Sequence, residues 1–508
     1  MSKFIKSVFA TSIGTLISKI SGYVRDIFIA KYLGNGLYSD IFFIAFKLPN
    51  LFRKITAEGA LSSAFIPIFA NGVNSYGKKK MLHFARNIFS ILLYFLIIVT
   101  VFFEIFMPQV MSLFAIGYHD EKLKSVILLS RITFPYLIFI SIIALASGIL
   151  NTFNKFFITS IGPVFLNASI VLFIYFSRNL LSENIMLFMS FGVVFSGILQ
   201  LIFIGFFLIR DGFYLFPIIP KLTKRTREFF DRFFGVFIAS GIVQINSFIS
   251  SIIATFVQGG VSLLYYGDRI AQFPLSLIGT AIGVSILPYL SKVINTDKEE
   301  SQMLQESSFF LSIFFGLPSS VFLFTLAEQI VCVLFERGKF TVFDTINVAN
   351  IVRIYSIAIP FFIFTKILNA IFYAKKDTKT PMYASLINLA INVVFSIFFL
   401  NMFGVNGIAI ASVISNLVST VIMFIKIIKE KIFIITEEFK IKFLKTLYLS
   451  ITMGIIIVCI RIWMTNLGTN DFLNLIFSGG IGGFVFLLLS QGFGVINIWE
   501  LINLFHVK

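Results

Sequence analysis

The sequence contains few of the residues that soluble enzymes use for chemistry. Among 508 residues there are two cysteines, three histidines and two tryptophans, and only 13% of the residues are charged. Cys332 and Cys459 lie far apart, in or beside apolar segments, so we interpret both as structural thiols and expect no metal site. No glycine-rich phosphate loop and no nucleophile–base motif is present. The sequence therefore gives no support for catalysis or ATP hydrolysis, and we expect no cofactor.

Long apolar segments fill most of the chain instead. Hydrophobic residues make up 58% of the sequence, and apolar runs of roughly 20–30 residues recur along it, each long enough to cross a bilayer as a helix. We predict an all-α polytopic membrane protein with about fourteen transmembrane helices. The predicted spans are 7–34, 38–70, 84–108, 125–150, 158–178, 185–209, 229–257, 262–290, 308–332, 346–373, 382–402, 405–428, 443–464 and 474–498.

The charge balance is strongly basic, with 41 Lys and Arg against 24 Asp and Glu. In a soluble protein this excess would indicate nucleic-acid binding. Here most cations lie in short connectors that follow even-numbered spans, where they set topology by the positive-inside rule. We therefore expect no nucleic-acid partner, and we place both termini in the cytoplasm. The first apolar stretch is too long for a cleavable signal peptide and contains Lys19, Arg25 and Asp26.

Sequence features also recur at a separation of about 220 residues. The features are Gly34, Asp40, Pro67, Arg131, Pro163 and Asn167 in the first copy, and Gly259, Asp268, Pro288, Arg353, Pro381 and Asn388 in the second. Because six spans separate the copies, both enter the membrane from the same side, as in parallel transporter repeats. We predict two six-helix lobes around a central cavity, 1–210 (spans 1–6) and 229–428 (spans 7–12), with two additional helices at 443–498.

Several polar residues lie inside predicted spans, where a charge costs at least about 2.5–3.5 kcal/mol and normally faces a bundle interior or a wet cavity. In the second span, Asp40, Lys47 and Lys54 recur every seven residues and therefore share one helix face. Pro49 interrupts this helix and frees a backbone carbonyl, which can bend the helix at the polar stripe. The other charged residues of interest are Lys19, Arg25 and Asp26 in the first span, Arg53 and Glu58 in the second, and Asp268 and Arg269 in the eighth.

In the first span, helical geometry turns Arg25 about 100° away from Asp26. In the eighth, Ser262, Arg269 and Gln272 share a face, and Asp268 is placed to orient its neighbour Arg269.

The cations outnumber the nearby acids, which favours a cavity for an anion. Arginine suits this role because its planar fork binds phosphate oxygens bidentately and stays ionised. The alternative is that the charges only pair with one another, above all Asp26 and Lys47, and hold the lobes together. We assign Lys19, Arg25, Arg53, Arg269, Asp40, Ser262 and Gln272 to substrate binding, and Asp26, Pro49, Glu58 and Asp268 to structural or gating roles.

Two sets of motifs resemble the MurJ (MviN) lipid II flippases of bacteria. The first set is Ser18-Lys-Ile-Ser-Gly-Tyr-Val-Arg-Asp26, Ala45-Phe-Lys-Leu-Pro-Asn-Leu-Phe-Arg53, Ala57-Glu-Gly59 and Phe65-Ile-Pro67. The second is Tyr265-Tyr-Gly-Asp-Arg269, Phe273-Pro274, Leu287-Pro288, Gly338-Lys-Phe-Thr341 and Lys379-Thr-Pro381. The resemblance covers about residues 3 to 500.

The resemblance implies the multidrug/oligosaccharidyl-lipid/polysaccharide exporter fold and no enzymatic activity. It implies transfer of undecaprenyl-pyrophosphate-linked disaccharide-pentapeptide (lipid II) from the inner to the outer leaflet of the bacterial cytoplasmic membrane. It also implies that Arg25, Arg53 and Arg269 match essential cavity arginines, and that Asp40 matches an important acid. Lys19 stands where the family often has arginine, so the charge is kept but the planar guanidinium is lost. Gln272 stands where some members have glutamate.

The mechanism predicted from both lines of reasoning is alternating access, in which Lys19 and the three arginines take over the counter-ions of the pyrophosphate while the prenyl tail stays in lipid. Membrane lipids and other cell-wall synthesis proteins are further partners to consider. Two alternatives remain: a cation-coupled multidrug or polysaccharide exporter of the same superfamily, which requires acids in the cavity, and a cell-wall scaffold that transports nothing and tolerates neutral cavity variants.

Overall fold

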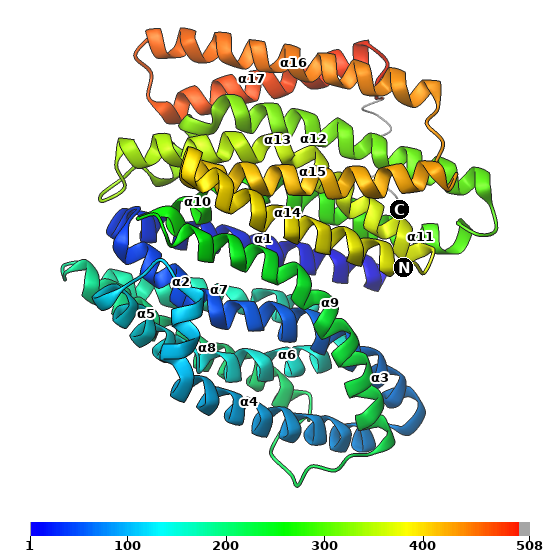
Figure 1. Ribbon diagram of the computed structural model, residues 1–508. Helices are drawn as coiled ribbons and strands as arrows, with labels where there is room; N and C mark the ends of the chain where they lie inside the picture. Colours follow the sequence, from blue (N-terminus) through cyan, green and yellow to red (C-terminus); the bar gives the residue numbers. More distant parts are fainter. Residues whose placement is uncertain (1, 497–508) are drawn as a thin grey trace. The chain divides into compact units, whose positions relative to one another are not determined.

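A computed structural model describes residues 2–496, except for the side chains of 2–12, 56–59, 238–240, 242–243 and 284. All regular secondary structure in this part of the chain is helical (Figure 1). The elements of the first half are α1 Ser2–Leu33, α2 Leu37–Phe52, η1 Arg53–Leu61, α3 Ser62–Tyr76, α4 Lys78–Phe114, α5 Asp120–Thr133, α6 Tyr136–Thr152, α7 Phe156–Ser177, α8 Ser182–Arg210 and α9 Lys224–Ala254. The second half contains α10 Gly260–Pro274, η2 Leu275–Gly279, α11 Thr280–Val293, α12 Lys298–Phe335, α13 Val342–Ala374, α14 Lys379–Phe403, α15 Val405–Lys429, α16 Glu437–Asn466 and α17 Asp471–Gly492.

The helices agree with the spans predicted from the apolar runs. Each of the fourteen predicted spans overlaps one helix or consecutive helices, such as α5 and α6 for the span 125–150, and the last two residues of the span 474–498 lie outside the described residues. Eleven helical segments of the described chain are long and apolar enough to cross a membrane. The prediction of an all-helical polytopic membrane protein is therefore confirmed.

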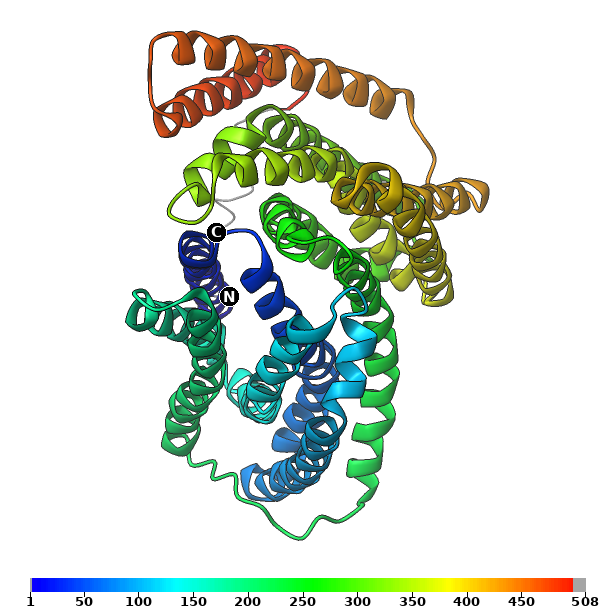
Figure 2. The same ribbon diagram turned by 60° about the vertical axis from the view of Figure 1, so that its left-hand side comes forward.

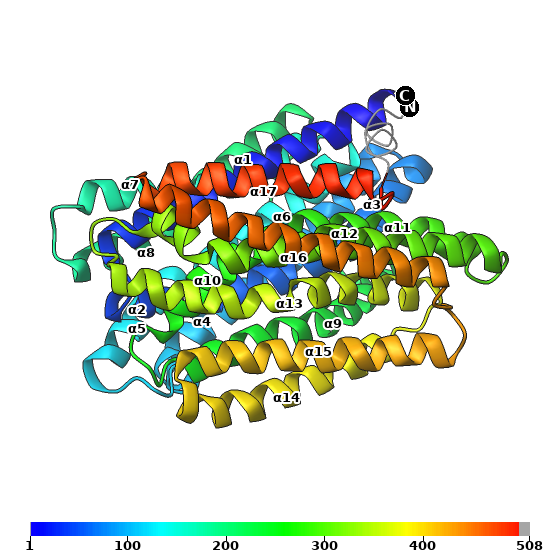
Figure 3. The same ribbon diagram turned by 90° about the horizontal axis from the view of Figure 1, so that it is seen from above.

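The chain divides into two compact units. Unit 1 contains residues 1–262 and Arg337–Phe340, and unit 2 contains Leu263–Glu336 and the chain from Thr341 onward. The sequence predicts a lobe boundary between 210 and 229, whereas α9 packs on η1, α3 and α4 of unit 1. In unit 2, α16 and α17 lie antiparallel, and both contact α12 (Figure 3). The lobe ranges of the sequence analysis stay a prediction.

Each unit contains a helix that changes to a π-helical segment close to a proline. In unit 1, α2 contains Pro49 and continues as η1 from Arg53. In unit 2, α10 ends at Pro274 and continues as η2. Proline removes a backbone donor and loosens the helical ladder, and π segments commonly mark functional positions. The carbonyl that Pro49 leaves without its usual partner belongs to Ala45, and the Thr133 hydroxyl of α5 lies 3.4 Å from it.

Two glycines allow the chain to approach itself closely within unit 1. Gly34, which follows α1, has φ +68°, and Gly338, between α12 and α13, has φ +64°. The Lys339 N–H donates to the Lys31 carbonyl oxygen at 2.9 Å. A Cβ on Gly338 would lie 2.3 Å from that same oxygen, and a Cβ on Gly34 would lie 2.5 Å from the Lys339 carbonyl oxygen. Only glycine fits these two positions without displacing backbone.

Candidate functional site

On α1, the charged residues of the first span form an intimate ion pair. Arg25 Nη2 and Nε lie 2.7 and 3.0 Å from Asp26 Oδ1. The Asp26 side chain is fully buried, and that of Arg25 is 11% exposed. The Arg25 side chain is long and flexible, so its guanidinium reaches the Asp26 carboxylate although the two residues point about 100° apart on the helix. The alternative in which these charges pair with each other holds for Arg25 and Asp26 in this structure, and a ligand contact of Arg25 stays a prediction.

The position of α1 in unit 1 is set by α7. Asn167 of α7 is buried and donates to the Ser21 hydroxyl at 2.9 Å and to the Ser18 carbonyl at 3.3 Å. Both contacts flank Lys19, which is half-buried. Because lysine is long and its head is hydrated, a half-buried position lets the stem pack while the ammonium reaches a polar region.

Asp40 and Ser262, assigned above to substrate binding, are joined in a buried cap. The Asp40 carboxylate accepts the Gly259 N–H and the Ser262 N–H, both at 2.8 Å, and the Ser262 hydroxyl at 2.7 Å. Both side chains have no exposure. A carboxylate at a helix N-terminus satisfies orphan N–H groups and complements the helix dipole. The structure thus gives both residues a structural role at the start of α10, and their contact with a ligand stays a prediction.

Lys47, which lies on the same predicted helix face as Asp40, contacts α9. Its ammonium donates to the Ser247 carbonyl at 3.0 Å and to the Ser251 hydroxyl, both on α9. This contact joins α2 to α9 inside unit 1. Lys47 therefore has a packing contact within unit 1, and the alternative that it pairs with another charge stays a prediction.

The polar residues that follow Pro49 lie where α2 changes to η1. Arg53 is half-buried, and its Nε donates to the Asn50 side-chain oxygen at 2.9 Å. Lys54 is exposed. Glu58 lies among the residues whose side chains are not described, so its gating role is a prediction only. Arg53 thus stands at the N-terminal end of a π segment, with the backbone angles of a right-handed helix.

In unit 2, α10 presents the polar face that the spacing predicts. Arg269 is half-buried, and Gln272 is exposed and donates to Asp268 Oδ1 at 3.3 Å. The opposite side of α10 packs closely on α13, since a Cβ on Gly267 would lie 2.4 Å from Ile351 Cγ2. This packing fixes the rotation of α10, so that Asp268 and Gln272 face outward from the unit.

The structure therefore brings together three pairs of the candidate residues, Arg25 with Asp26, Asp40 with Ser262, and Gln272 with Asp268. It places Asp268, Arg269 and Gln272 on one helix of unit 2. The meeting of cations from the two units in one cavity stays a prediction.

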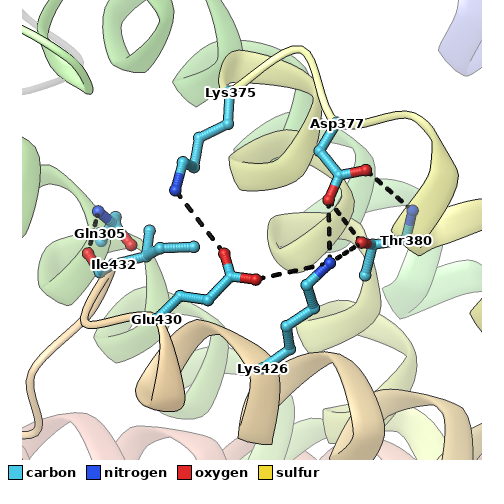
Figure 4. A network of polar contacts seen from close by, with 7 residues as sticks. All are labelled: Gln305, Lys375, Asp377, Thr380, Lys426, Glu430 and Ile432. Atoms are coloured by element: carbon cyan, nitrogen blue, oxygen red, sulfur yellow. Dashed lines mark hydrogen bonds and ion pairs between the residues drawn. The ribbon is translucent and has the colours of Figure 1, made fainter.

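A polar network in unit 2 was not predicted from the sequence, which indicated only a topological role for these lysines (Figure 4). Lys426 of α15 contacts Asp377 at 3.2 Å, Glu430 at 3.6 Å and the Thr380 hydroxyl. Asp377 also accepts the backbone N–H groups of Lys379 and Thr380 at 3.0 Å, and so caps α14. Partial burial raises the pKa of Asp377, but hydrogen bonds from Thr380 and Lys426 outweigh it and hold the pKa at about 2. An aspartate two residues before a helix start was the available signal.

Comparisons with known proteins place these residues in a family context. The family model described as "Lipid II flippase MurJ" matches residues 29–478. A probable lipid II flippase MurJ of Rickettsia prowazekii is 34% identical over 493 residues, covering 96% of each chain. A relative of the same description from Buchnera aphidicola subsp. Acyrthosiphon pisum is 31% identical and covers 99% of each chain.

Solved structures show the same fold. A lipid II flippase MurJ in an inward closed conformation superposes with a TM-score of 0.80 at 27% identity, over 95% of this chain and 98% of its own. An inward-facing multidrug resistance transporter of the MATE family has a TM-score of 0.66 at 17% identity, over 84% of this chain and 98% of its own, which shows likeness of fold alone.

Proposed function

Because the chain belongs to the MurJ family of lipid II flippases, we propose that it carries lipid II from the inner to the outer leaflet of the bacterial cytoplasmic membrane by alternating access, with Lys19, Arg25, Arg53 and Arg269 receiving the pyrophosphate. It is a multi-pass membrane transporter, and its activity is transfer of a lipid rather than catalysis. We infer that both termini lie in the cytoplasm, because the connectors after even-numbered spans hold most of the basic residues.

One observation carries this assignment of residues. Arg25, Arg53 and Arg269 are half-buried arginines within predicted membrane spans, on α1, at the start of η1 and on α10. A cation at such a depth is stabilised by anionic groups, and Asp26 is one such group for Arg25. A pyrophosphate supplies several anionic oxygens, which guanidinium groups bind bidentately.

The Arg25–Asp26 pair defines a state of the site that needs no substrate. Asp26 neutralises Arg25 at 2.7 Å and lowers the cost of keeping a guanidinium away from water. In the proposed cycle, the pyrophosphate competes with Asp26 for Arg25. Release then restores the internal pair, which keeps substrate affinity low enough for turnover.

The membrane potential can drive the proposed transfer. An interior-negative potential favours outward movement of an anion by about 2.3 kcal/mol per charge per 100 mV. The moving cations of the protein cancel part of this charge, so only the net displaced charge is driven.

The test is complementation of a host depleted of its own flippase, combined with a lipid II translocation assay in the same cells. We expect Arg25→Ala, Arg53→Ala and Arg269→Ala each to abolish growth and translocation at normal membrane abundance. Arg178→Ala is the matched control, because Arg178 is exposed and stacks on Tyr175 outside the site. Survival with all three site variants would defeat the proposal, as would equal loss with Arg178→Ala.

A further inference from the structure

A polar hollow lies at one end of unit 1, outside the residues assigned to transport. It has a volume of about 200 Å³ and lies between the last turns of α3 and the first turns of α9. Its polar lining consists of Asn71, Ser75, Tyr76, Arg225, Glu228 and Arg232. The hollow is large enough for a phosphate group and several waters.

Arg225 is a charged residue in the lining of this hollow. Its guanidinium carbon lies 3.9 Å from the centre of the Tyr76 ring, and Nη1 lies 3.8 Å from Met81 Sδ. The acid of the hollow, Glu228, is instead bound to Arg232 at 2.8 Å. Stacking on an aromatic ring fixes the plane of a guanidinium and leaves its N–H edge for an anion.

The connector 211–223 runs between α8 and α9 (Figure 2). Side chains of α4 hold it in place. Arg86 donates to the Tyr214 carbonyl at 2.8 Å and stacks on the Phe216 ring at 3.7 Å. Ser90 accepts the Ile218 N–H at 2.8 Å. Asn87 exchanges hydrogen bonds of 2.7 Å with both backbone groups of Lys221. These contacts hold the connector as an ordered strap.

The strap contacts α4 where the basic first turns of this helix give way to its apolar stretch. The first turns of α4 contain Lys78, Lys79, Lys80 and Arg86, and the helix is then free of charge from Ile88 to Phe103. With 37 residues, α4 is about 55 Å long, which exceeds the hydrocarbon thickness of about 30 Å. The contacts at Arg86, Asn87 and Ser90 thus place the strap at the boundary between head groups and acyl chains.

The strap has apolar residues on its surface, and the basic residues next to them lie at Lys221 and on the first turns of α9. Ile219 is 83% and Leu222 is 84% exposed. Between positions 221 and 232 there are five basic and two acidic residues. Exposed aliphatic side chains that flank clustered cations are the pattern of a segment that lies in the interface of an anionic bilayer.

We propose that this end of unit 1 is a binding site for the phosphate head group of an anionic phospholipid, held by Arg225 on its Tyr76 platform, while Ile219 and Leu222 insert among the acyl chains. The site is independent of the transported lipid. We assign the site to the cytoplasmic leaflet, and only that assignment rests on the topology proposed above.

The test uses the full-length protein in phosphatidylcholine nanodiscs that contain a photoactivatable phosphatidylglycerol. We expect crosslinks to map to the end of α3 and the start of α9, and unlabelled phosphatidylglycerol to displace the probe. Arg225→Gln should weaken the apparent affinity about tenfold, as expected for a charge-assisted bidentate contact. Arg227→Gln is the matched control, because it removes an exposed arginine two residues away that does not line the hollow.

Three outcomes would overturn the proposal. Equal losses with Arg225→Gln and Arg227→Gln would show diffuse attraction. Displacement of the probe by inorganic phosphate as readily as by phosphatidylglycerol would show a soluble-anion site, and displacement by unlabelled phosphatidylcholine would show no head-group preference. If Arg225→Gln does not fold, Arg225→Lys takes its place. The same competition experiments on the unaltered protein also test the proposal. Lipid II translocation by the same variants is scored separately, so that lost transport with intact crosslinking contradicts only the proposed function.

Discussion

Replacing Gly338 with alanine is expected to destabilise unit 1 by about 2–4 kcal/mol, and the amount follows from three contributions. The φ of +64° costs an alanine about 1–2 kcal/mol. The new Cβ would lie 2.3 Å from the Lys31 carbonyl oxygen, so the two segments must separate and lose the 2.9 Å bond from Lys339, at about 1–3 kcal/mol. The lower entropy of alanine in the unfolded chain offsets about 0.4–1 kcal/mol.

Gly468→Ala is the matched control for the backbone contribution. Gly468 follows α16 with φ +68°, but nothing lies within 4 Å of a Cβ at that position. Its alanine variant should lose only about 1 kcal/mol. The difference between the two variants therefore measures the close approach of Gly338 to Lys31.

The assay is unfolding in one detergent, followed by circular dichroism and by retention in size-exclusion chromatography. Gly34→Ala should resemble Gly338→Ala, because its Cβ would meet the Lys339 carbonyl oxygen at 2.5 Å. The double variant should be worse than either single one only by the backbone contribution of about 1 kcal/mol, since both substitutions open the same contact. Equal effects of Gly338→Ala and Gly468→Ala, or full additivity of Gly34→Ala and Gly338→Ala, would refute the reasoning.

Five further substitutions test three polar contacts inside the units. Asp40→Asn should lower the free energy of unfolding in detergent by about 2–4 kcal/mol, and Ser262→Ala should lower it by about 1 kcal/mol. The costs differ because only Asp40 accepts all three hydrogen bonds of the cap. Equal costs would contradict the cap. Lys47→Met should cost about 1 kcal/mol, and adding Ser251→Ala should change the unfolding midpoint little, whereas additive losses would show separate contacts. Asp377→Asn should cost about 1 kcal/mol at neutral pH, a value reduced for solvent exposure. Because the pKa of Asp377 is lowered to about 2, its contribution is present above pH 4 and is lost as the pH falls through 2, so unfolding curves of the variant and the original protein should converge there.

The positions of the helices could be predicted from the sequence because the membrane imposes one requirement on every span. A segment must be apolar over about 20 residues and must satisfy its backbone internally, and both conditions are visible locally. The interruption of the second span at Pro49 was also predictable, because proline removes a backbone donor from the helix. The nine-residue extent of η1 was not, because a π segment depends on packing against neighbouring helices.

The partners of the polar residues were less predictable. The carboxylate of Asp40 meets an N–H group 219 residues away, at Gly259, and no periodicity within one helix contains that contact. The helical-wheel argument separated Arg25 from Asp26 because it treats side chains as radial vectors. An arginine has enough rotatable bonds to reach a neighbour 2.7 Å away, and burial of the carboxylate favours that rotamer. The sequence could show which charges are intramembrane, whereas their pairing required coordinates.

The two π segments link the candidate arginines to the proposed motion. Arg53 begins η1, and Arg269 lies six residues before η2 begins at Leu275. A π segment has weaker backbone hydrogen bonds than an α-helix, so it bends at lower cost while keeping its donors and acceptors paired within the membrane. In the proposed motion, each unit bends at its π segment when the counter-ion of its arginine changes. Substrate binding and helix bending are then coupled within a few residues of each other. The family's transport activity then needs no large soluble domain to convert binding into movement.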